Sequence, residues 1–259
     1  MEIRLDGRVA LVTGGSTGLG RAMAEMFATS GAEVAIVARR PEPLEAARAA
    51  IAAKGGTVEA ISADVATADG CAAAHRAAVA RFGRVDILVN NAGQSATSPF
   101  EKIDDAAWQA DLDLKLFAAI RLTRLAFPGM KERRWGRVIN VLNTHAKAPG
   151  GGSAPTSVSR AAGMALTKVL SQEGAPHNVL VNALLVGQID SDQWVRQHAR
   201  LGTNVSYEEF LEQKGKPIPM GRVGRAEEFA SVACLLASDA GGYVTGTAIN
   251  VDGGRCPVV

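Results

Sequence analysis

Short apolar runs alternate with longer alanine-rich stretches along the chain. The runs have the length and the β-branched composition of strands buried on both faces, and apolar residues in the longer stretches recur with the period of a helix. Strands that follow one another through helical connections form a parallel sheet with right-handed crossovers and helices on both faces. The sequence therefore predicts an α/β fold built on a doubly wound parallel sheet.

No linker, repeat or low-complexity tract divides the chain, so we expect residues 1–259 to form a single domain. The expected strands are 9–12, 34–37, 58–61, 87–89, 138–142, 179–185 and 248–251. The expected helices are 18–29, 43–53, 67–81, 104–126, 154–174 and 226–237.

Residues 188–216 interrupt the alternation with two short polar helical patterns, at 190–200 and 206–214. In a doubly wound sheet this insertion follows the carboxyl end of a strand, where ligands bind. We interpret it as a helical substrate lid, with a surface excursion that has no role as the alternative. Three aromatic residues in the lid, Trp194, Tyr207 and Phe210, suggest an apolar or ring-bearing small-molecule substrate.

Composition and charge exclude several classes of partner. A formal charge of +2 with interspersed acidic and basic residues gives no field that favours nucleic acid or an anionic membrane. No apolar run approaches the roughly 20 residues that span a bilayer, and the first residues lack a signal peptide, so we expect a cytoplasmic protein. Cys71, Cys234 and Cys256 are too far apart to suggest disulfides or a metal site.

A glycine-rich loop, Thr13-Gly14-Gly15-Ser16-Thr17-Gly18-Leu19-Gly20, joins the first predicted strand to the first predicted helix. A helix that begins after such a loop presents unpaired N–H groups and the positive end of its dipole to a pyrophosphate. Its glycines supply the tight turn, the close backbone approach and the close helix packing that this geometry needs. The predicted phosphate-binding residues are Gly14, Ser16, Thr17, Gly18, Leu19 and Gly20.

The end of the second predicted strand indicates which dinucleotide is bound. A carboxylate here, roughly 20 residues after the glycines, accepts hydrogen bonds from an adenosine ribose and repels an added phosphate. Ala38 does neither, whereas Arg39 and Arg40 offer planar donor groups to a 2'-phosphate. We therefore expect NADP rather than NAD. Two solvated arginines at a helix entry are the alternative interpretation.

Further short motifs follow the glycine loop in a fixed order. They are Asp64-Val65, Asn90-Asn91-Ala92-Gly93, Pro219-Met220-Gly221-Arg222 and Asp252-Gly253-Gly254. Together with the loop, and over essentially the whole chain, they make the sequence similar to the short-chain dehydrogenase/reductase family. The resemblance implies a seven-stranded Rossmann-type sheet, and a homotetramer or homodimer built on the two long helices. It also implies that Asp64 and Val65 lie at the adenine, and that Asn91, Ala92 and Gly93 lie near the ribose.

The same resemblance locates the reaction centre, where the residues differ from the family's pattern. Thr156 stands at the position of the family's catalytic tyrosine and Arg160 at that of its lysine. Asn143 replaces the serine thirteen residues before the tyrosine, and Lys115, seven residues after Trp108, replaces the helical asparagine. The reaction centre is therefore expected to use different chemistry.

The replacements differ in what they can do. Threonine is too weak an acid to take over the proton transfer of a phenol. Arg160 can position the nicotinamide ribose, and the Asn143 amide can polarise a carbonyl. His145, which shares a face with Asn143 if this segment stays extended, and Lys115, whose pKa burial beside Arg160 would depress, are the candidate proton carriers. The alternatives are a loop histidine and a solvated helix lysine.

The loop after the sixth predicted strand is expected to cover the nicotinamide through Gly187, Ile189 and Ser191. Three functions remain open from these residues. The first is an NADP-dependent oxidoreductase that acts on a carbonyl or alcohol with a rebuilt proton donor. The second is a lyase, isomerase, hydrolase or cyclase on the same scaffold, and the third is a catalytically silent nucleotide-binding protein.

Overall fold

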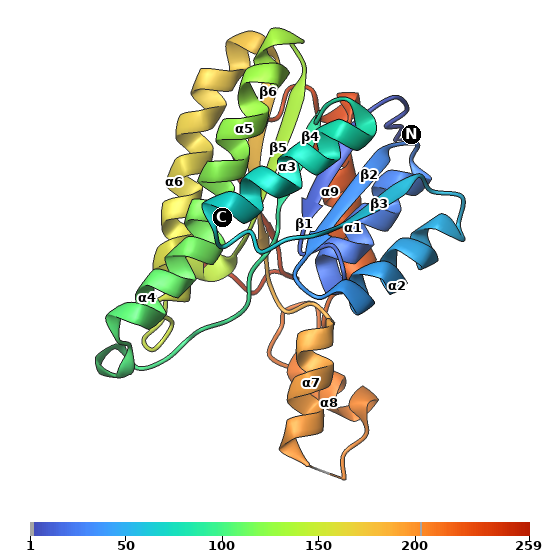
Figure 1. The fold of residues 1–259 in the computed structure, drawn as a ribbon. Helices are drawn as coiled ribbons and strands as arrows, with labels where there is room; N and C mark the ends of the chain where they lie inside the picture. The colour runs from blue at the N-terminus through green and yellow to red at the C-terminus, as the bar shows by residue number, and fades with distance from the viewer. Residues whose placement is uncertain (1–2, 203) are drawn as a thin grey trace.

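The computed structural model describes residues 3–202 and 204–259, which form one seven-stranded sheet in the order β3-β2-β1-β4-β5-β6-β7. All neighbouring strands pair in parallel, and the doubly wound, Rossmann-type prediction is confirmed (Figure 1). The strands are β1 Val9–Thr13, β2 Glu33–Ala38, β3 Val58–Ser62, β4 Ile87–Asn90, β5 Gly136–Asn143, β6 Val179–Val186 and β7 Ala248–Val251. The strand order reverses between β1 and β4, which opens a crevice at their carboxyl ends.

Helices cover both faces of the sheet (Figure 1). On one face α1 packs against α2 and α9, and on the other α3, α5 and α6 lie side by side. Their bounds are α1 Gly18–Thr29, α2 Pro41–Ala52, α3 Ala68–Phe82, α4 Asp105–Leu112, α5 Ala118–Glu132, α6 Thr156–Gly174, α7 Asp192–Leu201, α8 Tyr207–Gly215 and α9 Ala226–Ala237. Within the described ranges, no helix combines the length and the apolar character needed to cross a membrane.

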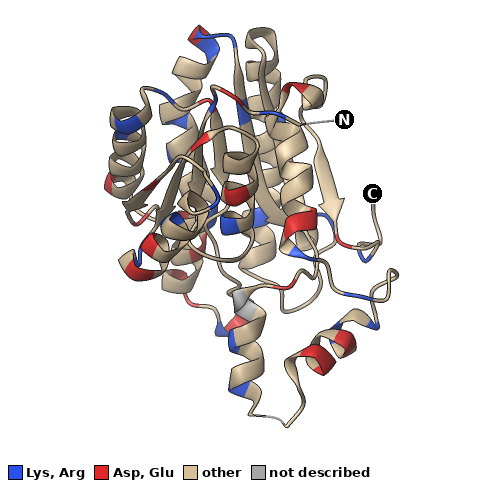
Figure 2. Cartoon of the chain, turned by 90° about the vertical axis from the view of Figure 1, so that its right-hand side faces the viewer, with Lys and Arg blue, Asp and Glu red and all other residues tan. Residues whose placement is uncertain are grey.

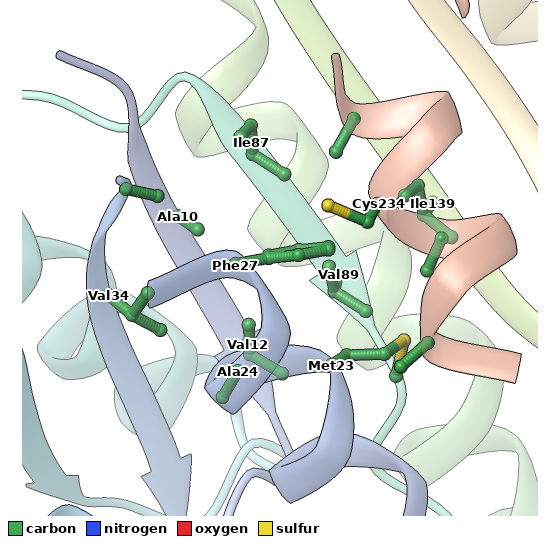
Figure 3. Packing of buried hydrophobic residues seen from close by; sticks show 14 of the residues in the cluster. Ala10, Val12, Met23, Ala24, Phe27, Val34, Ile87, Val89, Ile139 and Cys234 are labelled. Carbon is green, nitrogen blue, oxygen red and sulfur yellow. The ribbon is translucent and has the colours of Figure 1, made fainter. Parts of the chain in front are cut away.

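The core between the sheet and the helices consists of aliphatic and aromatic side chains. Phe27 of α1 and Phe229 of α9 are fully buried and pack over Val12, Val89 and other central strand residues (Figure 3). Burying a side chain of this size stabilises a fold by about 1.5 to 3 kcal/mol. This layer fixes the amino end of α1, and thus the glycine loop, against the end of β1.

The predicted helix 104–126 differs from the structure in two ways. It is divided by a π-helical turn at Asp113–Phe117, which separates α4 from α5. The second part also continues through Pro128 to Glu132. We attribute this extension to packing, because Phe127 and Met130 are buried and hold the last turns of α5 against the sheet.

Two helices of the predicted lid project from the body of the molecule (Figure 1). Helix α8 begins with a capping box, in which the Ser206 hydroxyl accepts a hydrogen bond from the Glu209 N–H and the Glu209 carboxylate accepts one from the Ser206 N–H. The 188–216 insertion therefore contains two short helices, α7 and α8, as the sequence predicts.

Candidate functional site

The crevice between β1 and β4 is closed at its base by two polar side chains. The Thr13 hydroxyl donates to the Val89 carbonyl and accepts from the backbone N–H groups of Asn91 (2.9 Å) and Ala92 (3.0 Å). The Asn91 amide donates to the carbonyls of Thr13 (2.9 Å) and Gly14 (3.3 Å). These bonds tie the glycine loop to the end of β4 and leave the loop's outer surface open.

The glycine loop has no room for a side chain at Gly20, where the backbone passes close to Gly14. A Cβ at Gly20 would lie 2.1 Å from the Gly14 carbonyl oxygen, and Gly14 itself has a φ of +65°. Helix α1 begins within this loop, at Gly18, without a side-chain cap and without an acidic residue in its first turn. Its first N–H groups therefore face the crevice with only solvent or a ligand as partners.

A cavity of about 510 Å³ runs along this loop and across the ends of β1, β2, β3 and β4. It brings together most of the residues predicted to bind the dinucleotide. These are Gly14, Ser16, Thr17, Gly18, Leu19, Gly20, Arg39, Arg40, Asp64, Val65, Asn91, Ala92, Gly93 and Ser191. The Asp64 carboxylate accepts a hydrogen bond from the Ala66 N–H at 3.1 Å, which shapes the loop after β3.

A second cavity, of about 800 Å³, continues from the first and shares Leu19, Asn91 and Gly93 with it. It reaches the carboxyl ends of β5 and β6 and extends beneath the lid. Of the predicted site residues it is lined by Asn143, His145, Arg160 and Gly187. Ile189, predicted to hold the carboxamide, lines neither of these two cavities. It is buried in the core and forms a β-bridge with Gly224.

The expected geometry of His145 is wrong, although its location in the cavity is as predicted. The chain does not stay extended after Asn143 but turns into a 3-10 helix at Thr144–Ala146. The turn forms because the N–H groups of Lys147 and Ala148 both donate to the Thr144 carbonyl at 3.1 Å. His145 is therefore exposed at the cavity wall, while Asn143 lies deeper, at the end of β5.

Thr156 and Lys115 lie outside both cavities, in a buried network between the π-helical turn and α6. The Lys115 ammonium donates to Asp111 and, at 2.8 Å, to the Thr156 hydroxyl. Thr156 also accepts from the Ala96 N–H at 3.1 Å, and the Ser159 hydroxyl donates to Asp111 at 2.6 Å. The side chains of Asp111 and Lys115 are each 1% exposed. We call these four residues, Asp111, Lys115, Thr156 and Ser159, the buried brace.

The two cations at the reaction centre have lowered pKa values. Burial lowers the pKa of Lys115, against the opposing hydrogen bond and charge of Asp111. The alternative interpretation of Lys115 as a solvated helix lysine is thus wrong. Burial lowers the pKa of Arg160 to about 10, against the opposing charge of Asp111, so the guanidinium keeps its charge at neutral pH.

Two buried polar atoms in the second cavity wall lack a partner among the described residues: Asn143 Oδ1 and Arg160 Nε. Arg160 is held in place by a 2.6 Å bond from its Nη1 to the Val141 carbonyl, and a Cβ at Gly93 would lie 2.6 Å from its Nη2. Buried polar groups in folded proteins are nearly always paired. The side chains that carry these atoms line the second cavity, and together with the uncapped α1 they fit a dinucleotide in the joined cavities.

The lid aromatics pack on one another, and Trp194 among them also lines the second cavity. Trp194 and Tyr207 both pack on Phe210, with ring centroids 6.1 and 6.0 Å away, and Phe210 is 6% exposed. The Tyr207 hydroxyl donates to Asp190 at the base of the lid. Tyr207 and Phe210 thus belong to the lid's own core, and the suggestion of an apolar or ring-bearing substrate stays a prediction.

Several residues that line the site or support it are not predicted from the sequence. Asp111 and Ser159 are two of them, although the spacing of Asp111 and Lys115 is that of an ion pair on one helix face. The others are basic side chains on the wall of the second cavity: Arg196, Arg200, Lys214 and Arg255.

A doubly wound sheet with an uncapped helix and a glycine loop at its switch point defines a dinucleotide-binding protein. A family model described as short chain dehydrogenase matches residues 8–201. The chain is 34% identical to the 3-oxoacyl-[acyl-carrier-protein] reductase of Aquifex aeolicus, over 98% of this chain and 99% of that protein. It therefore belongs to the short-chain dehydrogenase family.

Solved structures agree with this assignment. The L-sorbose reductase of Gluconobacter frateurii, solved with NADPH and L-sorbose, is 32% identical and superposes with a TM-score of 0.95 over all of both chains. A 3-oxoacyl-(acyl-carrier-protein) reductase from Agrobacterium tumefaciens, solved with NADP bound, is 31% identical with a TM-score of 0.90, over 98% of this chain and 96% of that one.

Proposed function

We propose that the protein is an NADP-dependent oxidoreductase that acts on a carbonyl or alcohol group of a small molecule with a rebuilt proton-transfer site. The observation that carries this proposal is the cavity lined by Asn143, His145 and Arg160, which is continuous with the glycine-loop cavity. NADPH-bound and NADP-bound relatives of the same fold support the choice of cofactor. When bound, NADPH supplies a hydride.

The residues of this chain then have separate roles. The first turn of α1 and the loop residues bind the pyrophosphate, and Arg39 and Arg40 bind the 2'-phosphate. Arg160 holds the nicotinamide ribose, with Gly187 and Ser191 beside the ring. The Asn143 amide orients the substrate oxygen by a hydrogen bond from Nδ2.

His145 is the proposed proton carrier. It lines the second cavity together with Asn143, and histidine titrates nearest to neutral pH of all side chains. Lys115 is buried, is bonded to Asp111 and Thr156, and does not line the cavity. We therefore assign Lys115 and Thr156 positioning roles, because the brace fixes the start of α6 and with it Arg160, one turn further along.

Substituting His145 tests the proton-transfer role. We expect wild-type protein to oxidise NADPH when a panel of carbonyl compounds is added, and His145→Ala to lower kcat by roughly 10²- to 10⁴-fold, the usual contribution of a general acid. The affinity for NADPH, measured by fluorescence titration, should stay the same. His177→Ala, near the opposite end of α6, is the matched control. Unchanged turnover in His145→Ala would refute the role.

Arg39 and Arg40 are exposed on the wall of the first cavity, and no described carboxylate pairs with either. Replacing both with alanine should weaken NADPH binding by roughly 100-fold or more, because hydrogen bonds to charged groups contribute about 1.5 to 3 kcal/mol each. NADH binding should not change. Calorimetry with both nucleotides measures this, and tighter binding of NADH than NADPH by the wild type would contradict the assignment.

A second candidate is a non-redox enzyme on the same scaffold. It is favoured by the withdrawal of the Thr156 hydroxyl into the buried brace, since the cavity keeps a cation and a histidine that suit stabilisation of an enolate. Turnover by cofactor-stripped protein separates this candidate from the first. Cofactor binding without turnover of any kind leaves the third, a catalytically silent NADP-binding protein.

The proposal extends to assembly as a homodimer or homotetramer through α5 and α6. Apolar side chains are exposed on both helices: Leu125 (40%) on α5, and Val158 (49%) and Val169 (53%) on α6. A second copy that covers these residues would remove them from water.

A further inference from the structure

Every charged residue that the structure places on the wall of the second cavity is basic. They are Arg160, Arg196, Arg200, Lys214 and Arg255, and His145 adds a titratable ring. No described aspartate or glutamate lines this cavity. For a chain with a formal charge of only +2, this is a strong local separation of charge.

Apart from Arg160 of α6, these cations come from the two consecutive lid helices and from the segment near the end of the chain. Arg196 and Arg200 lie on α7, Lys214 on α8 and Arg255 in the segment after β7. Figure 2 shows the charges of the lid separated, with basic residues along α7 and acidic residues at the start of α8. The fold thus brings these side chains together on the wall of one cavity.

Within the described part of the chain, none of Arg196, Arg200, Lys214 and Arg255 forms an ion pair with a carboxylate, although many other arginines do. Lys214 lies over the Phe210 ring, with its Nζ 5.4 Å from the centroid. Like charges gathered around one cleft repel each other and concentrate anions in it. Their arrangement is therefore complementary to an anionic ligand.

The cofactor's phosphates do not account for these residues. In the first cavity the uncapped α1 and Arg39 and Arg40 already face the positions of phosphates. Arg196 lines both cavities and can serve either ligand, whereas Arg200, Lys214 and Arg255 line only the second. These three remain for the substrate.

We propose that the substrate carries an anionic group, a carboxylate or a phosphate, which Arg200, Lys214 and Arg255 bind beneath the lid. Its reacting carbonyl lies at Asn143 and His145, which line the same cavity. This inference rests on the proposed function only for the position of the carbonyl, because the anion site itself is defined by the three cations.

Calorimetry on protein saturated with NADP⁺ tests this, since the nucleotide fills the glycine-loop site first. The carboxylate arm compares acetoacetate with methyl acetoacetate, and the phosphate arm compares dihydroxyacetone phosphate with dihydroxyacetone. We expect the anion of at least one pair to bind about tenfold or more tightly than its neutral partner, and the arm that shows this identifies the group.

The variant Arg200→Gln/Arg255→Gln should lose this preference. Arg76→Gln, which removes an exposed cation from α3 outside both cavities, should keep it. Equal binding within both pairs, or a preference that survives in the double variant, would overturn the proposal. The outcome does not depend on turnover, so a protein that prefers anions but never oxidises NADPH would refute the proposed function alone.

Discussion

Lys115→Met is expected to lower the free energy of unfolding by about 3 to 5 kcal/mol, the usual loss when one partner of a buried ion pair is removed. The substitution leaves the Asp111 carboxylate, 1% exposed, with the Ser159 hydroxyl as a partner but without its cation. It also leaves the Thr156 hydroxyl without the ammonium. Urea unfolding followed by circular dichroism measures this free energy. Thermal unfolding of the same variant should show a fall in Tm of roughly 6 to 20 °C.

Two further variants show whether this loss comes from the ion pair. Asp111→Leu/Lys115→Met should recover most of the stability, because removing both charges leaves Ser159 bonded to the Thr156 carbonyl at 3.1 Å and Thr156 bonded to the Ala96 N–H. Arg48→Met, which breaks the exposed pair with Glu45, should cost no more than about 1 kcal/mol. If Lys115→Met costs as little as Arg48→Met, the buried brace is not a stabilising element.

Gly20→Val is expected to reduce NADPH affinity by about 100-fold or more, because the loss of two hydrogen bonds to a charged pyrophosphate, at about 1.5 to 3 kcal/mol each, has an effect of that size. A Cβ at this position would lie 2.1 Å from the Gly14 carbonyl oxygen and 2.5 Å from the Asn91 amide nitrogen. Both atoms belong to the bonds that tie the loop to β4, so the loop must move away from α1.

Gly150→Ala is the matched control, because a Cβ there meets nothing within 4 Å and the residue has no positive φ. Its NADPH affinity, measured by the same fluorescence titration, should equal that of the wild type. Circular dichroism on Gly20→Val separates loss of the site from loss of the fold. A well-folded Gly20→Val protein with undiminished affinity would show that the loop does not bind the cofactor.

The strand and helix pattern is predictable from the sequence because it depends on local composition. Short, mainly apolar runs such as 179–185, rich in β-branched residues and separated by helical stretches, favour buried strands, and the glycine loop favours a tight turn between a strand and a helix. The π-helical turn at Asp113–Phe117 is not predictable in this way. The extended path expected after Asn143 is wrong because backbone bonds to Thr144 bend the chain, and no residue type there signals the turn.

The basic residues that line the second cavity are not predictable from the sequence for a different reason. Arg200, Lys214 and Arg255 occur in ordinary polar segments, and only the folded arrangement of α7, α8 and the chain after β7 places them on one wall. Trp194, Tyr207 and Phe210 show the converse. Their apolar character is visible in the sequence, but their contacts with each other are not.

The buried brace also restricts how this protein can change in evolution. Each of its members forms a hydrogen bond with another member. A phenol introduced at position 156 would replace the Thr156 hydroxyl, which accepts hydrogen bonds from both the Ala96 N–H and the Lys115 ammonium. Substitution of any one member alone would leave a buried polar partner without its bond and lower the stability of the fold. Change at this place is therefore expected to require several simultaneous substitutions, which selection acting on one residue at a time does not readily supply.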